Sequence, residues 1–167
     1  MQICGAFYQV KMNHKIRINP IQPANIQEAM DLVRRVFLSS VASEYSSQGI
    51  DEFFGYANAE SMRKRLGAHD FALAAYLADK IVGLIEVRNN DHISLLFVDD
   101  PYQHEGIGRA LCQHAIGICK ENGPAIQSIT VNASPNAVTA YRHIGFLPME
   151  EEQLVNGIRY IPMRLNL

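Results

Sequence analysis

The chain has 167 residues, of which 48% are apolar and 19% charged, as expected for one globular domain with a real hydrophobic core. A net charge of −2 argues against the broad basic surface that nucleic acids require, so any bound anion needs a local device. Three Cys without metal-ligand spacing argue against a disulfide framework and structural zinc, and no apolar run reaches membrane-spanning length. We therefore expect a cytoplasmic protein with free thiols, no metal, no nucleic-acid partner and no membrane anchor.

The N-terminal part of the sequence predicts one strand and two helices. Residues 1–14 are interpreted as a probable extension ahead of a short strand at 17–20. Apolar residues spaced three and four apart predict a helix at 24–39, and a second short helix is predicted at 59–66. The segment 40–55 between them is less regular and mixes small, acidic and aromatic residues.

In the middle of the chain the pattern changes to that of strands. Three β-rich runs are predicted as strands at 71–78, 81–88 and 92–98. The first two are separated by Asp79 and Lys80, and a short polar turn precedes the third. Consecutive strands joined by tight turns predict an antiparallel meander.

The C-terminal part predicts helices at 106–121 and 134–144, a strand at 128–132 between them, and a final hairpin at 149–165. The strand–helix–strand order predicts a right-handed parallel crossover. An Asn-Gly pair within the hairpin is typical of a type I′ turn. Together the elements predict an α/β fold with a mixed sheet.

The clearest chemical signal is a pair of glycines, Gly106 and Gly108, at a predicted strand-to-helix junction. The first-turn amides of a helix are unpaired donors, and the helix dipole adds about half a positive charge there. Glycines let an anion approach these amides closely, so the junction is a candidate phosphate cradle. Tight packing is the alternative explanation, and neither the dinucleotide-binding nor the P-loop pattern is present.

A second motif follows the next predicted strand and contains Tyr141, which alone would indicate a packed amphipathic residue. In order and spacing, the two motifs resemble the GCN5-related N-acetyltransferase (GNAT) superfamily. The sequence Gln-His-Glu-Gly-Ile-Gly at 103–108 resembles the acetyl-CoA motif of that family. Asn136, Tyr141, Gly145 and Phe146 resemble its following helix motif.

The resemblance implies a single acetyltransferase domain over 1–167 with a GNAT-like architecture. We expect a mixed, mostly antiparallel sheet of six or seven strands flanked by about four helices. One pair of strands is expected to be splayed apart at the acetyl-CoA site.

The resemblance also implies acetyl-CoA as co-substrate. The expected contacts are Leu96, Phe97, Val98, Gln103, His104, Glu105, Gly106, Ile107, Gly108, Arg109, Asn132 and Asn136. Glu105 departs from the family pattern, because a carboxylate facing pyrophosphate would repel it. We therefore expect Glu105 to turn toward solvent and Arg109 or Arg142 to supply the local positive charge.

Catalytic roles follow from the same resemblance. Tyr141 is expected to protonate the departing thiolate, and a backbone amide near Leu96 to polarise the thioester carbonyl. The base that deprotonates the amine is left open between His92, Glu86 and water. A His with a pKa near 6.5 suits that role. The alternatives are that His92 is a surface residue at a strand end and that Glu86 is a solvent-facing charge.

We therefore predict transfer of an acetyl group from acetyl-CoA to a primary amine of a small molecule or amino-acid-like acceptor, by direct attack in a ternary complex. Acidic and aromatic residues at 40–56 and 150–160 would suit a cationic amine. A protein or peptide acceptor is one alternative, which an open groove would favour, and a non-catalytic acyl-CoA-binding regulatory module is another. Dimers are common in this family, so a homodimer is also considered.

Overall fold

The structure, a computed structural model, describes residues 8–9, 15–67 and 69–167. Nine strands of the described chain form one mixed sheet with the order β1-β2-β3-β4-β5-β6-β9-β7, and β8 pairs with β9 off this path. The strands are β1 (Tyr8–Gln9), β2 (Lys15–Pro20), β3 (Phe71–Leu77), β4 (Lys80–Arg88), β5 (His92–Val98), β6 (Ser128–Ala133), β7 (Leu147–Pro148), β8 (Gln153–Val155) and β9 (Ile158–Asn166).

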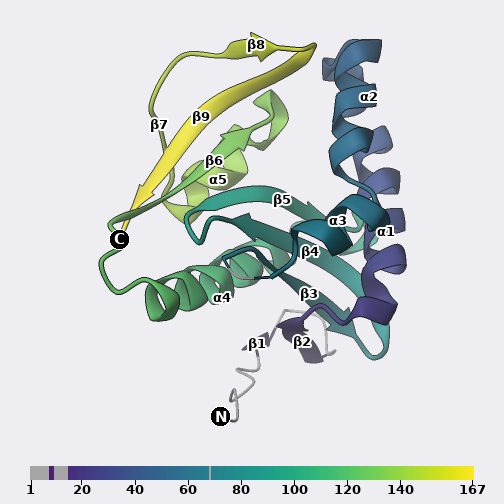
Figure 1. Ribbon diagram of the computed structural model, residues 1–167, viewed down its shortest axis with the longest axis vertical. Coiled ribbons are helices and arrows are strands. Elements are labelled where there is room, and N and C mark those ends of the chain that lie inside the picture. The colour runs from purple at the N-terminus through teal and green to yellow at the C-terminus, as the bar shows by residue number, and fades with distance from the viewer. Residues whose placement is uncertain (1–7, 10–14, 68) are drawn as a thin grey trace.

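Helices cover both faces of this sheet (Figure 1). The α-helices of the described chain are α1 (Ile26–Ser40), α2 (Ser47–Tyr56), α3 (Ala59–Arg65), α4 (Ile107–Asn122) and α5 (Val138–Ile144). Short 3-10 helices are η1 (Pro23–Asn25), η2 (Ala42–Glu44), η3 (Asp100–Tyr102) and η4 (Pro135–Ala137). One hydrophobic cluster packs under α1 and α3, and the other packs against α4 and α5.

The α/β prediction with a mixed, mostly antiparallel sheet is confirmed, and the structure adds elements to it. The additional strands β1 and β7 have only two residues each, and β8, the first strand of the predicted final hairpin, has three. The additional helix is α2, in the segment predicted to be irregular. The Ser46 side chain caps it by accepting a hydrogen bond from the Gly49 amide at 3.2 Å. Gly49 is the one fully buried residue of α2. The helix therefore lacks the stripe of buried apolar side chains from which a helix is predicted.

Two of the predicted turns can be compared with the structure in detail. The β3–β4 turn lies one residue earlier than predicted, at Ala78 and Asp79, because Lys80 already pairs with Leu77. The type I′ turn of the last hairpin is confirmed, since Asn156 and Gly157 have φ values of 51° and 80°. Of the predicted extension at 1–14, the structure describes only the pairing of β1 with β2, and the rest lies outside the described residues.

Strand β4 is buried along both faces. Every residue from Ile81 to Val87 is buried, because α1 and α3 cover one face of the strand and α4 covers the other. Gly83 allows the close approach of α4, since a Cβ there would lie 3.0 Å from Leu111. Glu86 is 0% exposed. The alternative reading of Glu86 as a solvent-facing charge is therefore wrong.

The parallel pair β5–β6 is splayed, as the resemblance implied. The two strands pair at only two positions, His92 with Thr130 and Ile93 with Val131, and then separate. Ser94 is an extra residue in β5, because Ile93 pairs with Val87 and Leu95 pairs with the adjacent Glu86. Such a bulge bends a strand and increases its local twist. The bend at Ser94 therefore helps to turn β5 away from β6.

The two sides of the gap meet again at the tip of the β8–β9 hairpin (Figure 1). The Ser46 amide donates a hydrogen bond to the Gly157 carbonyl at 3.2 Å. The backbones approach so closely that a Cβ on Gly49 would lie 2.2 Å from that carbonyl oxygen. Farther along, the Asn136 side-chain amide donates to the Ser40 carbonyl at 3.1 Å. The space beneath is thus bridged at two points.

We predict that Gly49→Ala destabilises the protein by about 1–3 kcal/mol, because the new methyl group must displace the hairpin. The matched control is Gly55→Ala on the same helix, where a Cβ meets nothing within 4 Å. This control should keep or slightly raise stability through the higher helix propensity of Ala. Urea unfolding of both variants checks the prediction, and equal stability of the two would contradict the close contact.

Candidate active site

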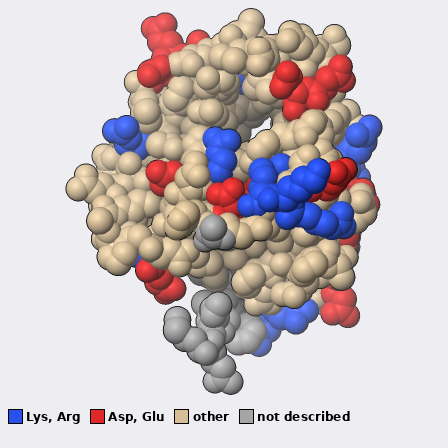
Figure 2. All heavy atoms as spheres, in the orientation of Figure 1, with Lys and Arg blue, Asp and Glu red and all other residues tan. Residues whose placement is uncertain are grey.

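A cavity of about 490 Å³ occupies the gap between the splayed strands. One side comes from α1, α2 and the segment between them, and the opposite side from β6, η4 and α5. Strand β5 and the start of α4 complete the wall. Figure 2 shows the opening between α2 and the C-terminal strands. The segments that carried the two sequence motifs therefore line one common space.

The start of α4 carries unpaired backbone amides at the cavity wall. The first hydrogen bond of this helix runs from the Ala110 amide to the Gly106 carbonyl at 3.0 Å. The amides of Ile107, Gly108 and Arg109 precede it and have no partner within the helix. Gly106 has a φ of 84°, which favours glycine, and a Cβ at Gly106 would meet nothing within 4 Å. The residues present thus fit an anion-binding cradle.

The loop before α4 is held by its own side chains. The Gln103 side-chain amide donates to the Val98 carbonyl and to the Asp100 carboxylate, both at 3.0 Å. The neighbouring Asp99 is buried and forms ion pairs with Arg35 at 3.0 Å and Lys80 at 3.4 Å. Gln103 therefore shapes the loop, and the Asp99 ion pairs join the end of β5 to α1 and to the β3–β4 hairpin.

Only some of the ionisable residues near the cradle face the cavity. Arg109 and His104 line the cavity, whereas Glu105 and Arg142 do not. Glu105 is half-buried on the loop rather than exposed. Arg109 is thus the nearest of the two expected Arg side chains, and Glu105 stays out of the cavity wall.

The strands supply the remaining predicted contacts with acetyl-CoA. Leu96, Phe97 and Val98 line the cavity on β5, and beyond Ile93 the side of β5 that faces β6 has no paired strand among the described residues. Backbone groups on such an edge can pair with an extended ligand. Asn132 lines the cavity from β6. Asn136, from η4, lines it as well.

Tyr141 lies in α5 and lines the cavity although only 6% of the residue is exposed. Its ring packs edge-on against Phe146, with 5.4 Å between centroids. Burial, and to a smaller extent the Cys112 thiol, raise the pKa of Tyr141 well above 10. The phenol therefore keeps its proton at neutral pH and can act as a donor within the cavity.

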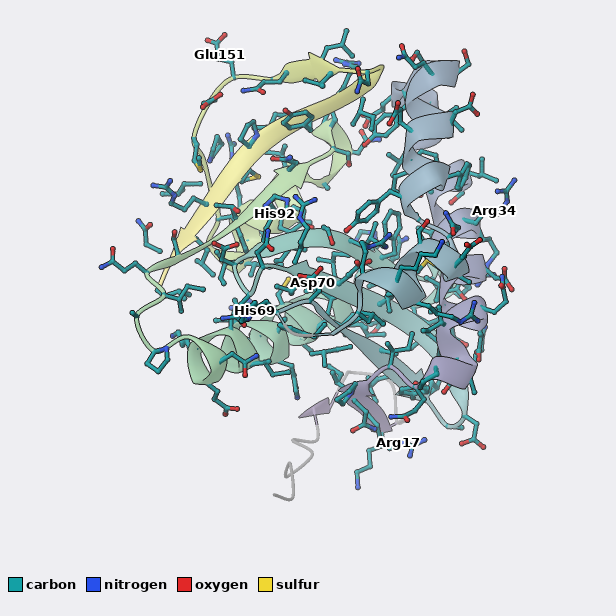
Figure 3. The ribbon with its side chains drawn as sticks, viewed as in Figure 1. Arg17, Arg34, His69, Asp70, His92 and Glu151 are labelled. Atoms are coloured by element: carbon teal, nitrogen blue, oxygen red, sulfur yellow. The ribbon has the colours of Figure 1, made fainter. Side chains whose placement is uncertain are left out.

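His92 is half-buried at the start of β5, close to β6 (Figure 3). Its Nδ1 lies 2.8 Å from the Thr130 hydroxyl. Burial lowers the pKa of His92 below 6.5, the Arg88 charge lowers it further, and Asp91 opposes this shift. His92 is thus neutral at pH 7 but does not line the cavity.

Glu86, the other candidate base, is held in a buried ion pair. Arg65, from α3, donates to its two carboxylate oxygens at 2.7 and 3.0 Å, and the Tyr56 hydroxyl donates to one of them at 3.2 Å. Figure 2 shows Lys and Arg side chains gathered over α3, and Arg65 is the member of that helix that pairs with Glu86. Glu86 does not line the cavity.

Several lining residues were not predicted individually from the sequence. Ser94, Val36 and His143 line the cavity, but no local motif marks them. Tyr45 and Phe53 lie within the predicted acceptor wall at 40–56 and do line the cavity. None of the acidic residues of either predicted acceptor segment lines it. Figure 3 shows one of them, Glu151, pointing away from the molecule.

The cysteines on α4 are not candidate nucleophiles. Cys112 and Cys119 are both buried. Burial raises the pKa of Cys112 to about 12 and that of Cys119 to about 11, so both remain protonated thiols. Within the described residues, no group of three or more His, Cys, Asp or Glu could hold a metal ion. No described helix is long and apolar enough to cross a membrane.

A family model described as an acetyltransferase (GNAT) domain matches residues 41–167. The chain belongs to the GNAT acetyltransferase family. It is accordingly an acetyl-CoA-dependent N-acetyltransferase. The family resemblance drawn from the two sequence motifs is confirmed.

Solved structures share this GNAT fold. A GCN5-related N-acetyltransferase from Rhodopseudomonas palustris is 21% identical, with 90% of this chain and 94% of that chain covered and a TM-score of 0.77. PaiA N-acetyltransferase from Thermoplasma acidophilum, solved with coenzyme A, is 21% identical, with 91% and 99% covered and a TM-score of 0.73. Aminoglycoside 6'-N-acetyltransferase from Enterococcus faecium is 14% identical, with 89% and 96% covered and a TM-score of 0.67. No curated protein sequence matches the chain.

At 100 times its Kd, coenzyme A should stabilise the wild-type protein by about 2.7 kcal/mol and so raise its melting temperature. We predict that Gly108→Asp abolishes this rise. The added carboxylate would repel the phosphates at the unpaired amides, whereas a first-turn Asp is itself favourable for a helix. Gly108→Ala should retain most of the shift, because its Cβ has only an ordinary contact with Val98 at 3.7 Å.

The matched control is Gly117→Asp on the same helix, where a Cβ meets nothing within 4 Å. Thermal unfolding with and without coenzyme A compares the variants. An undiminished shift in Gly108→Asp would show that the phosphates bind elsewhere.

Proposed function

We propose that this acetyltransferase transfers the acetyl group of acetyl-CoA to a primary amine of a small molecule or amino-acid-like acceptor, by direct attack in a ternary complex. The observation that carries the proposal is that the amide cradle of α4 and the aromatic side chains of Tyr45 and Phe53 line one and the same cavity. Both substrates can meet there without a covalent enzyme intermediate. The protonated, buried thiols of Cys112 and Cys119 agree with this route.

The residues of this chain divide the binding of acetyl-CoA between them. The amides of Ile107, Gly108 and Arg109 hold the pyrophosphate, with the Arg109 side chain nearby. The free edge of β5 at Leu96 and Val98 takes the extended arm. The thioester supplies the acetyl group, and an amide near Leu96 polarises its carbonyl.

The two bridges across the cavity support a small acceptor over a peptide. The Ser46–Gly157 and Ser40–Asn136 hydrogen bonds bridge the space from one side to the other, and a peptide would need an open groove. The aminoglycoside 6'-N-acetyltransferase that shares the fold is named for a small polyamine sugar as acceptor, which also supports this class. A thiol-release assay over alkyl diamines, amino-acid amides, aminoglycosides and lysine peptides tests the proposal. Release with peptides alone would contradict it.

We propose that Tyr141 protonates the departing thiolate. Tyr141→Phe should lower kcat by about 10²–10⁴-fold, the usual range for loss of a general acid, with little change in the KM for acetyl-CoA. The matched control is Tyr76→Phe in β3, because Tyr76 is half-buried but does not line the cavity. A wild-type kcat in Tyr141→Phe would exclude the acid role.

We assign the base to His92, acting through an intervening water, because Glu86 is already bound by Arg65. The pKa of His92 lies below 6.5, so the imidazole is neutral and can accept a proton at pH 7. When the pH decreases through that pKa, His92 becomes protonated and the rate should fall. His92→Ala should lower kcat and remove this acidic limb from the pH–rate profile. His69→Ala, at an exposed position that does not line the cavity, should leave the limb in place. An unchanged profile in His92→Ala would point to solvent as the base.

A further inference from the structure

A buried charge lies behind the acceptor side of the cavity, and no step described above uses it. Glu86 is 0% exposed, and the guanidinium of Arg65 contacts both of its oxygens. In a bidentate ion pair of this kind, both carboxylate oxygens accept N–H groups of the guanidinium. Each oxygen thus serves as a hydrogen-bond acceptor.

Tyr56 is fixed between these two charges. The Arg65 guanidinium lies 3.6 Å from the centroid of the Tyr56 ring and donates to the Tyr56 carbonyl at 2.8 Å. The Tyr56 hydroxyl lies 3.2 Å from a Glu86 oxygen. Because that oxygen is only an acceptor, the single phenol proton must point to Glu86. The Tyr56 oxygen can then only accept from any other neighbour.

Ser94 connects this pair to the cavity. It is the bulge residue of β5 and lines the cavity wall. Its hydroxyl lies 3.4 Å from the Glu86 carbonyl oxygen, which is an acceptor. Burial raises the pKa of Tyr56, and a hydrogen bond with Ser94 opposes that rise. The Glu86 carbonyl and the Tyr56 oxygen can both only accept from Ser94, so its single proton goes to one of them. The lone pairs of the Ser94 oxygen are left for a group in the cavity.

We propose that Ser94 orients the acceptor amine: its Oγ accepts one N–H of the neutral amine, and Arg65, Glu86 and Tyr56 fix the direction of the hydrogen-bond chain behind it. This inference rests on the proposed transfer to an amine. With one N–H held by Ser94, the nitrogen lone pair is turned to a defined side. Ser94 is thus a binding residue for the acceptor, and Tyr56 is a positioning residue that acts through Ser94.

The kinetic test uses Ser94→Ala and Tyr56→Phe with the amine of highest turnover in the thiol-release panel. Each variant should lower kcat/KM for that amine about 3–10-fold, as expected for one lost hydrogen bond, with the KM for acetyl-CoA unchanged. The double variant should lose no more than Ser94→Ala alone, because both substitutions break the same chain. Losses that multiply in the double variant would overturn the proposed coupling.

Matched controls are Ser128→Ala in β6 and Tyr76→Phe in β3, neither of which lines the cavity. Both should keep the wild-type kinetics, and all variants should keep the shift in melting temperature with coenzyme A. Equal activity of Ser94→Ala and Ser128→Ala would overturn the role of Ser94 while leaving acetyl transfer established. Failure of the wild type on every amine would overturn the proposed function, and the role of Ser94 with it.

A second measurement does not depend on turnover. The ring ¹³Cζ resonance of Tyr56, assigned with Tyr56→Phe, responds to hydrogen bonds at the phenol oxygen. Ser94→Ala should shift this resonance, because the phenol oxygen loses its neighbouring Ser94 hydroxyl, and Ser128→Ala should not. An unshifted resonance in Ser94→Ala would show that the chain does not exist.

Discussion

The active site depends on how soon β5 and β6 stop pairing. Two paired positions, at His92 and Ile93, join the strands, and the bulge at Ser94 follows immediately. Beyond it, β5 presents an edge without a strand partner, and α4 begins beside the open end. A fully paired sheet would fill this gap with backbone hydrogen bonds. The cavity therefore results from backbone pairing that ends early, and the side chains line the space that this pairing leaves open.

The buried ion pair of Glu86 and Arg65 is the strongest electrostatic constraint near this gap. Removing one member of such a pair typically costs about 3–5 kcal/mol, because a buried charge is left without a partner. The pair joins the central strand β4 to α3 and stacks on Tyr56 from α2. Helices α2 and α3 are thereby positioned by charge as well as by apolar packing, which fixes this part of the structure relative to β4 and the adjacent β5.

Much of the fold and the cradle could be predicted because their signals are local. Glycines at 106 and 108, and Tyr141 two turns into a predicted helix, keep their meaning whatever packs against them. The burial of Glu86 could not be predicted, because a charged side chain in a strand is mostly exposed unless it is paired, and its partner Arg65 comes from a distant helix. Ser94 was missed for a related reason: a bulge is a register shift between two strands, and one strand's sequence does not show it.

The contact of Gly49 with Gly157 joins segments separated by most of the chain. A cavity closed in this way is completed only after the last hairpin has been made and has docked on α2. During synthesis on the ribosome, the earlier helices and strands can therefore assemble before the hairpin bridges the cavity. Because Gly49 and Gly157 are far apart in the sequence, their contact has a high entropic cost of loop closure. We therefore expect it to form late in folding. The hairpin that bridges the cavity is thus the last part of its wall to be put in place as the chain folds.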